Sequence, residues 1–172
     1  MYHNVYRKVH DAYPLVHDDY AALHAQYWAN HLASTLSCIS HDPAKRFGEN
    51  IFFYAATVLP SETVLAKMTV HSFFIESKDY NYNNHENLDY HTRGHFTQLV
   101  WRSTKKLGIG VAIAYSSGNH GNPCMPNFPA TAIYVVIKYD PPGNVHSLRH
   151  YSNNVLPPTI PISHLLSDVQ FW

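Results

Sequence analysis

The spacing of hydrophobic residues predicts three helices in the first half of the chain. A short polar helix should end near residue 12, because Pro14 cannot continue it. A second helix is expected after Asp18 or Asp19, either of which can cap its first turn. Its core-facing positions recur at helical spacing: Ala21, Ala25, Trp28, Leu32 and Leu36. A third helix should begin after Ser61 as its cap and run to about Tyr80.

The second half of the chain predicts an antiparallel pair of strands. Apolar runs over 108–115 and 130–139 are separated by a connection, 116–129, that is rich in Gly, Asn and Pro. The segment DPPGN at 140–144 ends the second strand, since prolines cannot continue a ladder. Residues 39–50 and 81–94 are predicted as loops, and 51–56 as a short apolar segment. A short helix is expected after Ser163. Helices around an antiparallel sheet indicate a layered α/β fold.

Composition narrows the classes of protein that fit. The 172 residues carry 12 basic and 12 acidic side chains, so no net charge attracts the chain to nucleic acid. Hydrophobic residues make up 45% and charged residues 14%, which is typical of one packed domain. No apolar run is long enough for a membrane span, and the first ten residues lack the apolar stretch of a signal peptide. Cys38 and Cys124 can form one bridge or remain two thiols.

The 14 histidines raise the question of which imidazoles converge. His85-Glu86 with His91 resembles a zinc-protease motif, but the gap between the histidines is too long for one helical face. A run of five histidines at seven-residue intervals is interrupted by Pro14, so we interpret it as coincidence or surface solvation and not as a metal site: His3, His10, His17, His24 and His31. A more specific set combines two imidazoles with two carboxylates, which can form a polar cleft for a divalent ion: His41, Glu49, Glu76 and His95.

Several segments then show a family resemblance. GHFTQLVWRSTKKLGIGVA and YVVIKYDPPGN resemble the two signature segments of the CAP superfamily, also called SCP/TAPS. HNVYRKVH near the start, the A-Q-x-W-A pattern at 25–29 and GEN at 48–50 agree with it. Within the superfamily, NNVLPP at 153–158 is most similar to the Golgi-associated plant pathogenesis-related subgroup. Ile137 replaces the cysteine of secreted members, Phe73 replaces a common Trp, and Tyr2 replaces the Gly needed for myristoylation.

The resemblance implies a three-layer α-β-α sandwich with a largely antiparallel central sheet. It predicts one CAP domain over 1–158 and an extension, 159–172, packed on it. It also implies a cavity with a tetrad formed by His41, Glu49, Glu76 and His95, in which His41 and His95 bind zinc or another divalent metal. Gln98 and Thr97 are expected to line the same cleft. The alternative for each tetrad residue is a buried polar cluster that holds the fold together.

The function implied is a non-enzymatic carrier of lipids or sterols that contacts membranes or proteins, with Phe73, Phe74, Tyr80 and Tyr82 as apolar lining or as plain core. One alternative is a metal-assisted protease in which Glu49 or Glu76 activates water. Another is a secreted effector that acts on an immune receptor. The sequence leaves the localisation open between a mature extracellular chain and the cytosolic face of endomembranes. It also leaves a homodimer open.

Overall fold

The computed structural model describes residues 1–85 and 89–166 as two compact units. The sheet unit comprises His17–Pro60 and Leu107–Tyr139. The helical unit comprises Met1–Val16, Ser61–Lys106 and the chain from Asp140 onward. Glu86, which belongs to the protease-like motif, lies outside the described residues, as does the end of the predicted extension, 167–172.

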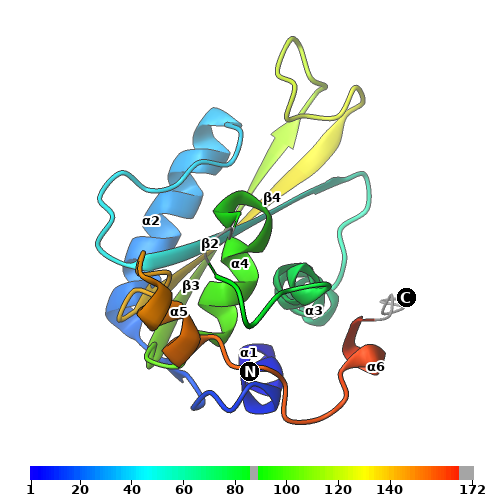
Figure 1. The fold of residues 1–172 in the computed structure, drawn as a ribbon. Helices are drawn as coiled ribbons and strands as arrows, with labels where there is room; N and C mark the ends of the chain where they lie inside the picture. The colour runs from blue at the N-terminus through cyan, green and yellow to red at the C-terminus, as the bar shows by residue number, and fades with distance from the viewer. Residues whose placement is uncertain (86–88, 167–172) are drawn as a thin grey trace. The chain divides into compact units, whose positions relative to one another are not determined.

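The sheet unit consists of a four-stranded sheet and one long helix. The strands are β1 (Val16–His17), β2 (Gly48–Ala56), β3 (Lys106–Ser116) and β4 (Ala130–Asp140), in the order β1-β3-β4-β2. Figure 1 labels the three long strands β2, β3 and β4. β2 pairs antiparallel with β4. Both predicted strands are confirmed, and β3 and β4 are hydrogen-bonded neighbours, so the α/β class is confirmed.

Helix α2 (Asp19–Thr35) packs its predicted apolar face on this sheet. Asp18 caps it and accepts the N–H of Ala21 at 2.9 Å. Ala25, Trp28 and Leu32 share a core with the strands that includes Tyr134. Two glycines of β3 permit a close crossing, because a Cβ on Gly108 or Gly110 would lie within 2.5 Å of α2 backbone atoms. The backbones of α2 and β3 are therefore in direct contact at this crossing.

A disulfide closes the far end of the sheet unit. Cys38, in the segment after α2, is bonded to Cys124 in the β3–β4 connection. The sequence left open whether these two residues pair, and the structure joins them. The bond links segments that are 86 residues apart in the chain, so it restricts the unfolded chain strongly.

The helical unit contains the remaining helices. They are α1 (Tyr2–Val9), α3 (Glu62–Phe74), the 3₁₀ turn η1 (Ile75–Ser77), α4 (Tyr90–Val100), α5 (Leu148–Asn154) and α6 (Ser163–Leu166). Ser61 caps α3 as predicted and accepts the N–H of Val64. α3 ends at Phe74, earlier than the predicted Tyr80. Among the described residues, no helix is long and apolar enough to cross a membrane.

The loop prediction for 81–94 is wrong at its end, because α4 already begins at Tyr90. Asp89 caps α4 by accepting the N–H of His91 at 2.9 Å. Asn144 then bonds the middle of α4: its amide donates to the carbonyl of Gly94 at 2.9 Å and its carbonyl accepts from the Thr97 hydroxyl at 2.7 Å. These bonds form only in the folded chain, so they stabilise a helix that the glycine alone would disfavour.

A buried arginine holds the C-terminal end of α4. Arg7 of α1 is fully buried and donates to the carbonyl oxygens of Leu99, Trp101 and Thr104 at 2.9–3.0 Å. Its Nε donates to the carbonyl of Tyr13 at 2.8 Å. The last carbonyls of a helix have no intrahelical donor. The guanidinium supplies those donors and so fixes α1 against the end of α4.

Candidate functional site

The first candidate pair, His41 and Glu49, lies in the sheet unit. His41 belongs to the loop before β2, and Glu49 is the second residue of β2. The Nδ1 of His41 lies 2.5 Å from Oε1 of Glu49. The same carboxylate oxygen accepts the N–H of Asp42 at 3.1 Å. The imidazole ring is largely exposed, whereas the Glu49 side chain is 6% exposed, so the ring extends from a buried carboxylate toward solvent.

A buried lysine completes this cluster. The antiparallel register places Glu49 opposite Lys138 on β4, and cross-strand neighbours of this kind have side chains in reach of each other. The Nζ of Lys138 bonds Oε2 of Glu49 at 2.6 Å and Oδ2 of Asp42 at 2.9 Å. The lysine side chain is 3% exposed. A buried charge requires partners, and here two carboxylates surround one ammonium.

These contacts set the protonation of the cluster. The hydrogen bond to Glu49 raises the pKa of His41, although partial burial opposes the shift. Burial works against ionisation of Glu49, but hydrogen bonds from His41 and Lys138 outweigh it and lower its pKa. Burial likewise opposes ionisation of Asp42, and the Ala44 N–H with Lys138 lowers its pKa. Both carboxylates are therefore ionised at neutral pH.

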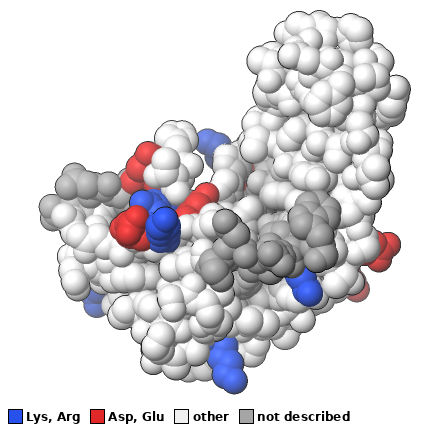
Figure 2. All heavy atoms as spheres, turned by 90° about the vertical axis from the view of Figure 1, so that its right-hand side faces the viewer, with Lys and Arg blue, Asp and Glu red and all other residues white. Residues whose placement is uncertain are grey.

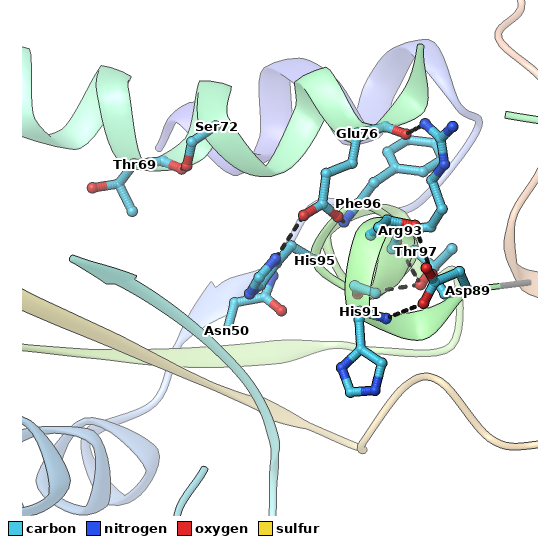
Figure 3. A network of polar contacts seen from close by, with 12 residues as sticks. Asn50, Thr69, Ser72, Glu76, Asp89, His91, Arg93, His95, Phe96 and Thr97 are labelled. Atoms are coloured by element: carbon cyan, nitrogen blue, oxygen red, sulfur yellow. Dashed lines mark hydrogen bonds and ion pairs between the residues drawn. The ribbon is translucent and has the colours of Figure 1, made fainter. Parts of the chain in front are cut away.

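The second candidate pair, Glu76 and His95, lies in the helical unit. Glu76 belongs to η1 and His95 to α4 (Figure 3). The Nδ1 of His95 lies 2.7 Å from Oε1 of Glu76, and the other carboxylate oxygen accepts the N–H of Phe96 at 3.0 Å. The ring of Phe73 stacks on the imidazole, with centroids 5.1 Å apart. Phe73, which stands where many members of the CAP superfamily have Trp, therefore supports the His95 ring.

Both pairs use the same atoms, Nδ1 of the histidine and Oε1 of the glutamate. A neutral imidazole that donates from Nδ1 carries its lone pair on Nε2. Carboxylate–histidine pairs of this kind fix the tautomer and orientation of metal-binding histidines in proteins. His41 and His95 thus have the chemistry of Nε2 ligands, and Glu49 and Glu76 have the chemistry of their orienting groups.

The structure brings the four predicted residues together as two pairs, one in each unit. Among residues 1–85 and 89–166, no three His, Cys, Asp or Glu side chains form a group that could hold a metal ion. Gln98 and Thr97, expected to line the cleft, are buried and bonded within the helical unit. Gln98 donates to Thr104 at 3.2 Å and accepts the N–H of Gly143 at 2.8 Å.

Two members of the His41 cluster were not predicted. Lys138 interrupts an apolar run, YVVIKYD, and a charge inside a buried strand is a signal for a buried partner. Asp42 follows His41 directly. Of the aromatic residues considered for a lipid lining, Phe73, Phe74 and Tyr80 are core residues with at most 8% exposure. Tyr82 is half-buried and contacts the rings of Tyr80 and Phe96.

Comparison with known proteins decides the family. The model of the CAP, or cysteine-rich secretory protein, family matches residues 1–139. This chain belongs to the CAP family. The Golgi-associated plant pathogenesis-related protein 1 of Homo sapiens is 32% identical over 159 residues, which cover 91% of this chain and 88% of the human one. A probable pathogenesis-related protein of Arthroderma benhamiae is 40% identical over 78 residues, but that match spans only 23% of its length.

Solved structures agree with the CAP assignment at the level of fold. The crystal structure of NaASP2 with Zn²⁺ matches with a TM-score of 0.60 and 22% identity, and covers 94% of this chain and 84% of that one. The crystal structure of MpPR-1i matches with a TM-score of 0.54 and 19% identity, and covers 90% of each chain. These likenesses confirm the predicted CAP fold.

Proposed function

We propose that this CAP protein binds a divalent metal such as zinc reversibly through Nε2 of His41 and His95. One observation carries the proposal: in each His–Glu pair the carboxylate accepts from Nδ1, which leaves the lone pair on Nε2. The structure supports this for each imidazole within its own unit, and the joint use of both imidazoles is taken from the family resemblance. When bound, the metal supplies a Lewis-acidic centre.

Two neutral nitrogen ligands bind a metal less tightly than a closed four-ligand site, so the binding is expected to be reversible and sensitive to pH. Protons compete with the metal for the imidazoles. Because Glu49 raises the pKa of His41, protons compete at this ligand already above the ordinary histidine value of 6.5. Zinc affinity should therefore begin to fall at a higher pH than an unperturbed histidine would give.

Isothermal titration of the full-length chain with Zn²⁺ tests the proposal. We expect one ion per chain and at least about tenfold weaker binding for His41→Ala and for His95→Ala. His17→Ala is the matched control, because this histidine also contacts a carboxylate but through Nε2, which lies 3.0 Å from Asp19. Zinc binding that is unaffected by both substitutions would refute the proposal.

We also propose that the protein carries a lipid or sterol and does not act as a hydrolase. A general base needs a pKa near the working pH, and the bonds from His41 and Lys138 lower the pKa of Glu49 instead. This supports a binding role over the alternative in which Glu49 activates water. The family resemblance supports lipid or sterol as cargo. Because Phe73 and Phe74 are buried, such cargo has to bind elsewhere or displace them.

Binding of a labelled sterol and a labelled fatty acid, with and without zinc, tests the cargo. The His41→Ala/His95→Ala double variant distinguishes the cargo site from the metal site. Uptake that survives this change places the cargo away from the two histidines. If the chain takes up neither ligand in a saturable way, the proposal that it is a carrier is refuted. Zinc-dependent cleavage of a peptide library that is lost in Glu49→Ala would establish the protease instead.

A further inference from the structure

A groove in the sheet unit lies between the C-terminal half of α2 and the outer edge of β3. It has a volume of about 430 Å³. Asn30, Ala33 and Ser34 line it from α2, and residues 111–114 line it from β3. The close crossing at Gly108 and Gly110 explains its position. Beyond these glycines the facing residues of β3 are Ala112 and Ala114, whose side chains are too small to fill the space as helix and strand separate.

The edge of β3 carries outward-facing backbone groups along this groove. β1, the outer neighbour of β3, has two residues. Next to it, Val16 N–H donates to Lys105, just before β3, and Asp18 N–H donates to Leu107, the second residue of β3. Strand alternation sends the N–H and C=O of every second residue to the same edge. Val111, Ile113 and Tyr115 therefore direct their backbone groups outward, as Leu107 does.

The side chain of Gln26 shows how this edge receives a peptide group. Its Nε2 donates to the carbonyl of Val111 at 2.8 Å, and its Oε1 accepts the N–H of Val111 at 3.0 Å. This primary amide thus makes the two hydrogen bonds that a residue of a neighbouring strand would make. Two residues farther along the strand, Ile113 is 56% exposed, and the edge there is adjacent to the groove.

The charge of the surface limits what can bind. From Leu107 to Ile137 the chain has no Asp, Glu, Lys or Arg, and none lines the groove. The loop between β3 and β4, at the top of Figure 1, is correspondingly white at the top of Figure 2. Ala112 and Ala114 give the groove an apolar floor, whereas the exposed side chains of Ile109, Val111, Ile113 and Tyr115 alternate with them on the opposite face of β3. An uncharged, apolar occupant therefore matches this surface.

A lipid chain and an apolar peptide differ in the hydrogen bonds that they can offer to the edge of β3. Lipid hydrocarbon would leave the outward N–H and C=O groups of β3 without hydrogen bonds, at a cost of several kcal/mol for each group. A polypeptide strand satisfies them. We propose that the groove between α2 and β3 binds an extended, uncharged peptide segment of a partner protein, which adds to β3 as an edge strand and places an apolar side chain over Ala112 and Ala114.

In this arrangement Gln26 occupies the first pairing position, at Val111, on the edge of β3 that would bind the peptide. Its amide holds the backbone groups of Val111, so the peptide pairs from Ile113 onward. Removal of this amide should extend the pairing by one residue and strengthen binding several-fold. Gln26 therefore limits the length of edge that is open, which is a common way for a protein to protect an edge strand from unwanted pairing.

Titration of the full-length ¹⁵N-labelled chain with a short capped peptide of alternating serine and valine tests the proposal. We expect chemical-shift changes that concentrate in residues 30–34 and 111–115. Ile113→Pro, which removes one outward N–H, should weaken binding about tenfold, and Ile113→Val should not. If the proline variant does not fold, Ser34→Trp tests the groove by filling it. Gln26→Ala should bind more tightly.

Three results would overturn the assignment. The first is shift changes outside the groove, or binding that is unchanged by Ile113→Pro and Ser34→Trp. The second is self-association of the chain that Ile113→Pro abolishes, because a second copy would then be the occupant. The third is adsorption to neutral phosphatidylcholine vesicles that depends on the same residues, without peptide binding.

Discussion

Replacement of Lys138 by methionine tests the buried charge cluster of the sheet unit. The lysine is 3% exposed and bonds two carboxylates, at 2.6 Å to Glu49 and 2.9 Å to Asp42. Each hydrogen bond between charged groups contributes about 1.5–3 kcal/mol, and relief of the lysine's own desolvation offsets part of the loss. We therefore expect Lys138→Met to lower the free energy of unfolding by about 3–5 kcal/mol at neutral pH.

The pH dependence identifies the cause of this loss. The pKa values of Asp42 and Glu49 are lowered in the folded state from 3.8 and 4.5. The resulting stabilisation is present above these values and is lost as the pH falls through the folded values. The difference between wild type and variant should therefore be largest above about pH 5 and should shrink in acid.

Urea unfolding followed by circular dichroism at neutral and acidic pH gives both quantities. The exposed Lys8→Met serves as control and should change the free energy of unfolding by less than about 0.5 kcal/mol. A loss below about 1 kcal/mol for Lys138→Met, or one that does not change with pH, would refute this account of the cluster.

Further substitutions test the packing, each by thermal and urea unfolding. Arg7→Met should destabilise the chain by about 3 kcal/mol or more, because it leaves buried carbonyl groups without donors; a near-neutral result would contradict the role given to this guanidinium. Gly110→Ala should cost about 1–3 kcal/mol through contact with the α2 backbone. Gly94→Ala should be neutral or stabilising, because a Cβ at this helical position would meet only the Asn144 side chain, at an ordinary contact distance of 3.8 Å; equal effects of the two substitutions would contradict the close crossing. Replacing Cys38 and Cys124 together by alanine should cost about 4 kcal/mol, and an unchanged denaturation midpoint would speak against the bond.

Local signals were sufficient to predict the principal helices and strands. Helix α2 and its buried face follow from residue spacing, and the caps Asp18 and Ser61 follow from side chains that can accept a nearby N–H. The start of α4 was missed although its cap, Asp89, is a local signal of the same kind. The support that Asn144 gives to Gly94 and Thr97 in the middle of the helix could not be predicted, because Asn144 is distant in sequence and bonds them only in the folded chain.

In the candidate site, too, local sequence predicts the residue types, whereas contacts between distant residues decide the arrangement. The four acid–base residues could be selected by motif, but which carboxylate contacts which imidazole depends on folding. Glu49 meets His41 because a short loop precedes β2, and it meets Lys138 because of the β2–β4 register. Neither register nor loop conformation can be derived from residue types alone. The Gln26 contact with Val111 likewise needs the crossing of α2 over β3.

The tautomers of His41 and His95 test the central claim most directly. Long-range ¹H–¹⁵N correlation spectra at about pH 8, where unperturbed imidazoles are neutral, distinguish the two ring nitrogens. We predict Nδ1–H tautomers for both histidines, and a zinc-induced shift of their Nε2 resonances that His17 does not show. Nε2–H tautomers, or Nε2 resonances that do not respond to zinc, would contradict the account.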